Sequence, residues 1–174
     1  MTGPHPNPVP IGTDHYYRDR LADFGERRPA ASPPEYYADF GDKCLHQFRQ
    51  TEPELTPLGR EWLQSTLVDL QRRMEERREQ DPVDFGRLEL DSDEFAKMAF
   101  EMHSDAYLAS GIAKLPVADL RRIAATPDVA DLITPEGLAE IGEVIGGVAS
   151  ERTIAPLRRL LMSIVDRVLR RRRR

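Results

Sequence analysis

The chain has 174 residues, 40% apolar and 32% charged, a composition typical of a globular protein with one domain. Its 25 basic and 30 acidic side chains give a formal net charge of −5, and a single cysteine excludes an intrachain disulfide. No apolar run approaches the ~20 residues that cross a bilayer, and no basic-then-apolar leader opens the chain, so we expect a cytoplasmic protein unless a dedicated machine exports it.

Prolines occupy every second position near the start of the chain: Pro4, Pro6, Pro8 and Pro10. Proline lacks an amide hydrogen and pushes the residue before it towards extended geometry. We therefore expect an extended arm over Met1–Thr13, followed by one short helix within Asp14–Arg28. Residues 1–31 are assigned to a Pro- and Tyr-rich arm that is partly disordered.

Two segments of the chain resemble each other. Tyr16-Tyr17 precedes the letters ADFGE, and Tyr36-Tyr37 precedes ADFGD. Chance similarity is one interpretation. The functional interpretation is that the arm carries a second copy of a docking element. Tyr16 and Tyr17 would then contact a partner, or would occupy on a neighbouring subunit the groove that Tyr36 and Tyr37 occupy in their own.

Helix-start signals follow in close succession. Ser32-Pro33-Pro34-Glu35 has the pattern of a capping box and predicts a helix to about Gln50. Thr56-Pro57 predicts the next helix, which ends before Pro82. Residues 81–90 are expected to form a connection. Asp91-Ser92-Asp93-Glu94 then predicts a helix to about Ser110, with Gly111 as its C-terminal cap.

The second half of the chain continues this pattern. Further helices are expected to open at Pro116, Pro127, Pro135 and Pro156. No segment alternates apolar and polar residues between hairpin turns. The predicted fold is all-α, a compact bundle of five to seven helices with a Pro-rich N-terminal arm and a basic amphipathic C-terminal helix. Residues 32–150 form the expected acidic helical domain, and residues 151–174 the basic helix.

One helix carries candidate catalytic side chains. His103 lies on the predicted helix after Ser92, so the simplest interpretation is a buried histidine with one hydrogen bond. The alternative is a hydrolase-like or toxin-like site in which His103 is the general base. Tyr107, His46 and Asp105 would support it. Cys44 lies on an apolar stripe and is expected in the core; the alternative is a Cys44–His103 nucleophilic pair, which requires tertiary packing to bring the two residues together. No metal-binding motif is present, and we expect no cofactor.

The two ends of the chain differ sharply in charge. Residues 151–174 contain nine arginines against two acids, a net charge of +7, whereas residues 1–150 contain 16 basic and 28 acidic residues, a net charge of −12. Gly146-Gly147 is expected to break the helix before this basic segment. The helix dipole accounts for one or two C-terminal arginines, but not for five in succession.

The basic segment is therefore the leading candidate for partner binding. Its proposed contact residues are Arg159, Arg167, Arg170, Arg171, Arg172, Arg173 and Arg174. The favoured partner is another protein with an acidic surface. An anionic membrane or non-specific nucleic acid are alternatives, and a homo-oligomer is compatible with the sequence. The function favoured by the sequence is a non-enzymatic interaction module or adaptor. An enzyme centred on His103, or an electrostatic adaptor at a membrane or nucleic acid, is the alternative.

Overall fold

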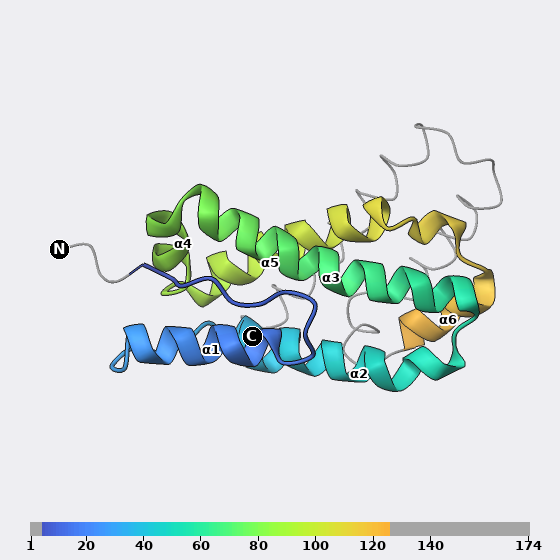
Figure 1. The fold of residues 1–174 in the computed structure, drawn as a ribbon, viewed down its shortest axis with the longest axis horizontal. Helices are drawn as coiled ribbons and strands as arrows, with labels where there is room; N and C mark the ends of the chain where they lie inside the picture. The colour runs from blue at the N-terminus through green and yellow to red at the C-terminus, as the bar shows by residue number, and fades with distance from the viewer. Residues whose placement is uncertain (1–4, 126–174) are drawn as a thin grey trace.

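The computed structural model of this chain describes residues 5–125 (Figure 1). The helices expected after residue 126, the Gly146-Gly147 break and the basic helix over residues 151–174 lie outside these described residues. The predicted all-α class is confirmed, because the described part contains helices and no strand.

The described helices follow one another with short connections. In chain order they are α1 (Tyr16–Arg27), the π-helix η1 (Tyr36–Asp42), α2 (Lys43–Thr51), the short 3-10 helix η2 (Glu52–Glu54), α3 (Pro57–Gln80), α4 (Pro82–Leu88), α5 (Ser92–Ala109), the 3-10 helix η3 (Ile112–Lys114) and α6 (Val117–Ala125). In Figure 1, α1, η1 and α2 follow one another along one side of the bundle, and α3 and α5 run along the other.

The predicted start of α3 is confirmed at atomic detail. The Thr56 side chain accepts a hydrogen bond from the Gly59 amide, and Pro57 occupies the first helical position. The carboxylate of Asp119, on α6, accepts the Thr56 amide at 3.0 Å and its hydroxyl as well. This buried aspartate therefore fastens the last described helix to the start of the longest one.

Two boundaries predicted from the sequence are wrong. Ser32 does not cap a helix: η1 begins after Glu35, whose amide donates to the Ser92 hydroxyl at 3.1 Å. Residues 81–90 are not a plain connection, because they contain α4. Its cap is Asp81, whose side chain accepts from the Asp84 amide, and α4 buries Phe85 within the core.

The N-terminal arm packs against the bundle. Residues 5–13 adopt no helix and run between α1 and α3 in Figure 1, with Pro6 buried. Hydrogen bonds join the arm to side chains of both helices. The described part of the arm is therefore extended, as predicted. It is held on the body and does not project from it.

Candidate functional site

Helix α5 places His103 inside the bundle. Its side chain is only 9% exposed, and Nδ1 lies 2.8 Å from the carbonyl oxygen of Ala99, one helical turn earlier. A carbonyl only accepts, so Nδ1 carries the proton and Nε2 is left as an acceptor. The Tyr36 hydroxyl lies 3.4 Å from Nε2 and is its nearest described donor.

Aromatic rings surround this imidazole. The rings of Tyr36, Phe40, Phe100 and Tyr107 have centroids between 5.7 and 6.1 Å from that of His103. Burial lowers the pKa of His103 to about 4, against the opposing effect of the Ala99 carbonyl. The ring is therefore neutral near pH 7, and its pKa lies well below the value that suits a general base at that pH.

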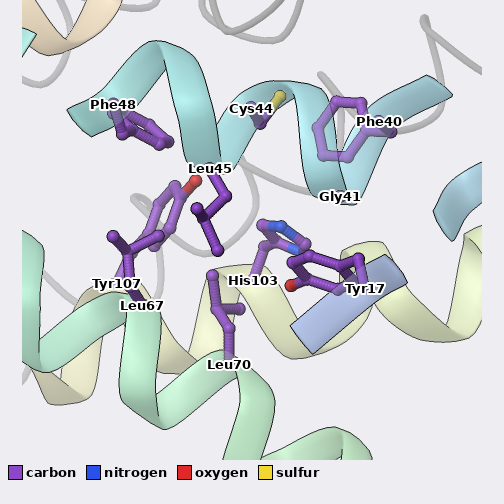
Figure 2. Close-up of a pocket in the computed structure, with 10 residues that line it drawn as sticks. All are labelled: Tyr17, Phe40, Gly41, Cys44, Leu45, Phe48, Leu67, Leu70, His103 and Tyr107. Carbon is purple, nitrogen blue, oxygen red and sulfur yellow. The ribbon is translucent and has the colours of Figure 1, made fainter. Parts of the chain in front are cut away.

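A small cavity opens beside the imidazole. Figure 2 shows it between α2, α3 and α5, lined by His103, Tyr17, Tyr107, Cys44 and apolar side chains. Its volume is about 10 Å³, which is room for about one water molecule. The hydroxyls of Tyr17 and Tyr36 are hydrogen-bonded to each other nearby. The arrangement can hold a water molecule but not an organic substrate.

The structure assembles only half of the predicted catalytic group. His103 and Tyr107 lie together, with ring centroids 5.8 Å apart. His46 does not join them: its side chain is 44% exposed, and Nε2 lies 3.7 Å from Asp42 on its own helical segment. Asp105 follows His103 by two residues on α5, a spacing that turns the two side chains about 200° apart. The predicted four-residue site is therefore not formed among the described residues.

The buried imidazole predicts a specific dependence of stability on pH. Because its pKa is about 4 in the folded chain and about 6.5 unfolded, the neutral ring's full contribution is present above pH 6.5. That contribution is lost as pH falls from 6.5 to 4. We expect the free energy of unfolding of the natural chain to drop by about 3 kcal/mol more over this range than that of His103→Phe. Urea denaturation at a series of pH values measures both. Parallel pH curves for the two chains would contradict the buried neutral ring.

Tyr16 and Tyr17, predicted as partner contacts, lie in the core. They are 0% and 5% exposed. Tyr17 packs edge-on against Tyr36, with centroids 5.9 Å apart, so the two similar segments meet inside one molecule. One ring of each pair donates to a carboxylate: the Tyr16 hydroxyl lies 2.8 Å from Glu75, and the Tyr37 hydroxyl 2.9 Å from Glu89. Neither Tyr16 nor Tyr17 is exposed to a partner in this structure.

Those carboxylates belong to a cluster of charged side chains enclosed by α1, α3, α4 and the arm. We call it the buried ion cluster; its members are Arg20, Asp23, Arg27, Glu75, Arg78 and Glu89. It contains three guanidinium groups and three carboxylates, so its formal charges balance. The side chains of Arg20 and Glu89 are both 0% exposed. Salt therefore screens these interactions far less than those of surface pairs.

Sequence reasoning missed this cluster, although a signal was present. Tyr16, Arg20, Asp23 and Arg27 recur at spacings of four, three and four, which is the spacing of a buried helical stripe. Three of these four side chains are charged, and charged side chains are seldom fully enclosed unless they are paired. The stripe therefore lacks the apolar residues that normally mark the buried face of a helix. The individual contacts are short: Arg27 Nη2 lies 2.8 Å from Glu89, and Arg78 Nε lies 2.8 Å from Glu75.

A second, wider hollow lies on the surface between α3 and the end of α5. Its volume is about 500 Å³, and its lining includes Gln64, Val68, Asp69, Arg72 and Ser110. Asp69 and Arg72 pair with each other there. Within residues 5–125, no set of three histidine, cysteine or acidic side chains is placed to hold a metal ion. None of the helices described here is long and apolar enough to cross a membrane.

Comparison of the chain with protein-family models, with curated proteins and with solved structures finds no match.

Proposed function

We propose that this chain is a non-enzymatic protein-interaction module. Its acidic helical body acts as a scaffold, and its basic segment, residues 151–174, binds a partner protein with an acidic surface. The observation that supports it is the separation of charge along the chain, −12 over residues 1–150 and +7 over residues 151–174. Opposite charges on two molecules steer their encounter and select among partners.

The described body fits the scaffold role. Residues 5–125 carry 16 basic and 23 acidic side chains, a net charge of −7. Most of their arginines already pair with carboxylates of the same body, as Arg18 does with Asp42 and Arg49 with Asp14. The excess of carboxylates favours a role for the body as an acidic support. The arginine-rich end is then the part of the chain that supplies positive charge for binding a partner.

The enzymatic alternative has less support. With a pKa of about 4, the His103 imidazole is a weak base near pH 7, and the cavity beside it, at about 10 Å³, is too small for an organic substrate. A membrane or nucleic acid remains an alternative partner for the basic segment, because each also presents a dense array of negative charge.

Neutralising the basic end tests the proposal. We expect replacement of Arg170–Arg174 by glutamine in the full chain to lower recovery of the partner from a cell lysate roughly tenfold or more. Five charged contacts at ~0.3 kcal/mol or more each supply that factor. Quantitative mass spectrometry of the captured proteins measures the recovery.

The matched control removes the same charge from the body. Its five substitutions to glutamine are at Arg87, Lys97, Lys114, Arg121 and Arg122, all exposed. Partner recovery is expected to survive them. Equal recovery with the natural and the tail-neutralised chains would refute the proposal. Recovery abolished by nuclease or by detergent would replace the protein partner with nucleic acid or a membrane. Binding that survives ~0.5 M salt is not mainly driven by counterion release.

A further inference from the structure

The side chains that hold the N-terminal arm bind almost entirely to its main chain. We call them the arm-binding site: Arg20 and Asp23 of α1, and Gln71, Glu75 and Arg78 of α3. Each is less than 9% exposed. The arm that they hold has no charged side chain between Pro6 and Thr13. An uncharged extended segment therefore covers enclosed charged and amide groups.

The contacts at the start of the arm match its proline spacing. The Asn7 amide donates to Asp23 Oδ1 at 3.2 Å, and the Val9 amide to Glu75 Oε2 at 3.4 Å. The intervening positions are prolines, which have no amide hydrogen to satisfy. Carbonyl groups accept in turn: Arg20 donates to the Asn7 oxygen, and Arg78 donates to the Pro6 oxygen at 3.4 Å. At Asn7 and Val9, between the prolines, the arm therefore presents amides where the site presents carboxylates.

A single amide side chain fixes the other end of the arm. Gln71 Oε1 accepts the Gly12 amide at 2.6 Å and the Thr13 amide at 3.3 Å, and Gln71 Nε2 donates to the Thr13 oxygen at 2.9 Å. At Gly12 the chain turns towards α1, with φ at +78°. Residues other than glycine rarely adopt this left-handed backbone conformation. Any other residue at position 12 would therefore strain the turn, which we call the hinge of the arm.

From these contacts we infer that the arm-binding site is a peptide site that also accepts residues 5–11 of a second copy of this chain, so that two chains exchange arms. A second copy carries the same prolines and amides at the same spacing, so exchange conserves the contacts of Pro6, Asn7 and Val9 described above. The hinge at Gly12 changes, and with it the contacts that Gln71 makes to Gly12 and Thr13. The opened site exposes mainly charged and amide groups, which water solvates readily. The inference does not depend on the partner proposed for the basic segment.

The hinge provides the test. Gly12→Val in the full chain disfavours the left-handed turn of the closed monomer, whereas an exchanged arm can extend across to its neighbour. We expect the dimer dissociation constant to fall roughly tenfold or more. Light scattering at protein concentrations from about 1 to 100 µM measures the mass. A variant that stays monomeric throughout this range overturns the inference.

Gly111→Val is the matched control. Gly111 is the other described glycine with a left-handed conformation, φ +84°, and it follows α5 at a distance from the arm in the sequence. A side-chain carbon added at Gly12 meets no atom within 4 Å, and one at Gly111 meets only the Lys114 side chain, at 3.5 Å or more. Both substitutions therefore act through backbone strain. Gly111→Val should destabilise the chain without promoting a dimer, and equal dimerisation of both variants would contradict arm exchange.

A cross-linking experiment identifies the exchanged segment. It is carried out first on chains that keep Gly12. A side-chain carbon at Gly86 would lie 3.5 Å from Cδ and 3.6 Å from Cγ of Pro6, so positions 6 and 86 are neighbours in the closed arrangement. Pro6→Cys and Gly86→Cys are placed on separate full-length chains that differ in mass, both lacking Cys44. We expect a mixed disulfide dimer after equilibration, with a higher yield when Gly12→Val is added. A single chain that carries both cysteines is the positive control and should close its own disulfide. If it does so while no mixed dimer forms, the inference is overturned. A Gly12→Val dimer that does not form the mixed disulfide also overturns it.

Discussion

Replacing Arg20 by methionine is expected to lower the free energy of unfolding by about 3–5 kcal/mol, the cost of removing one partner from an enclosed ion pair. Arg20 is 0% exposed and contacts Asp23 at 3.2 Å and Glu75 at 3.5 Å. Its loss leaves the buried ion cluster with two guanidinium groups for three carboxylates. It also removes the donor to the Asn7 carbonyl, so the arm should become more accessible to protease. Urea denaturation followed by circular dichroism measures the change.

Arg18→Met is the control for this prediction, because Arg18 lies on the same helix. Its side chain is 55% exposed and pairs with Asp42 at 3.2 Å. Exposed pairs contribute ~0–1 kcal/mol, so this substitution should change stability little. Equal losses at positions 18 and 20 would mean that the cluster is solvated and does not hold the arm.

Gly41→Ala is expected to destabilise the chain by about 1–3 kcal/mol, the usual cost of forcing extra volume into a packed core. A side-chain carbon at Gly41 would lie 2.6 Å from the Tyr17 ring, closer than two carbons can approach. Tyr17 cannot move away easily, because its ring packs between Tyr16 and Tyr36 at 5.1 and 5.9 Å. Thermal denaturation followed by circular dichroism detects the loss.

The similar segment at the start of the chain supplies the control. Gly25 occupies the same place in its Asp-Phe-Gly sequence, but a side-chain carbon there meets no atom within 4 Å. Gly25 lies in α1, so Gly25→Ala should stabilise the chain by ~0.5–1 kcal/mol through helix propensity. A stabilising effect of alanine at both positions would contradict the contact between Tyr17 and Gly41.

The helices were predictable wherever the chain carries its own start signal. Thr56-Pro57 and Asp91-Ser92 mark the first turns of α3 and α5 by local chemistry, and the structure confirms both. Asp81-Pro82 carries the same signal, but α4 spans only seven residues, too few to show an apolar stripe. The π-helix η1 was not predictable, because a 3.6-residue pattern carries no sign of its wider turn; Gly41, where the Tyr17 ring approaches closely, lies within it.

The contents of the interior were predictable only in part. His103 and Tyr107 are four residues apart on one helix, so their proximity follows from helix geometry alone. The placement of His46 depended on tertiary packing, and the structure does not bring His46 to His103. Arg20 and Glu75 are 55 positions apart, and a sequence pattern gives no sign that they meet. The burial of Tyr16 beside Arg20 and Glu75 likewise follows from tertiary packing and could not be predicted from the sequence.

The basic segment, residues 151–174, is proposed to bind another molecule. Photo-cross-linking from position 167 of the full chain tests it most directly. A photoreactive residue replaces Arg167, the chain is irradiated in a cell lysate, and mass spectrometry identifies the linked peptides. We expect links to acidic segments of a different protein, and we expect substitution of Arg170–Arg174 by glutamine to reduce them. Links confined to residues of the same molecule would contradict the claim and make the basic segment a structural part of its own body.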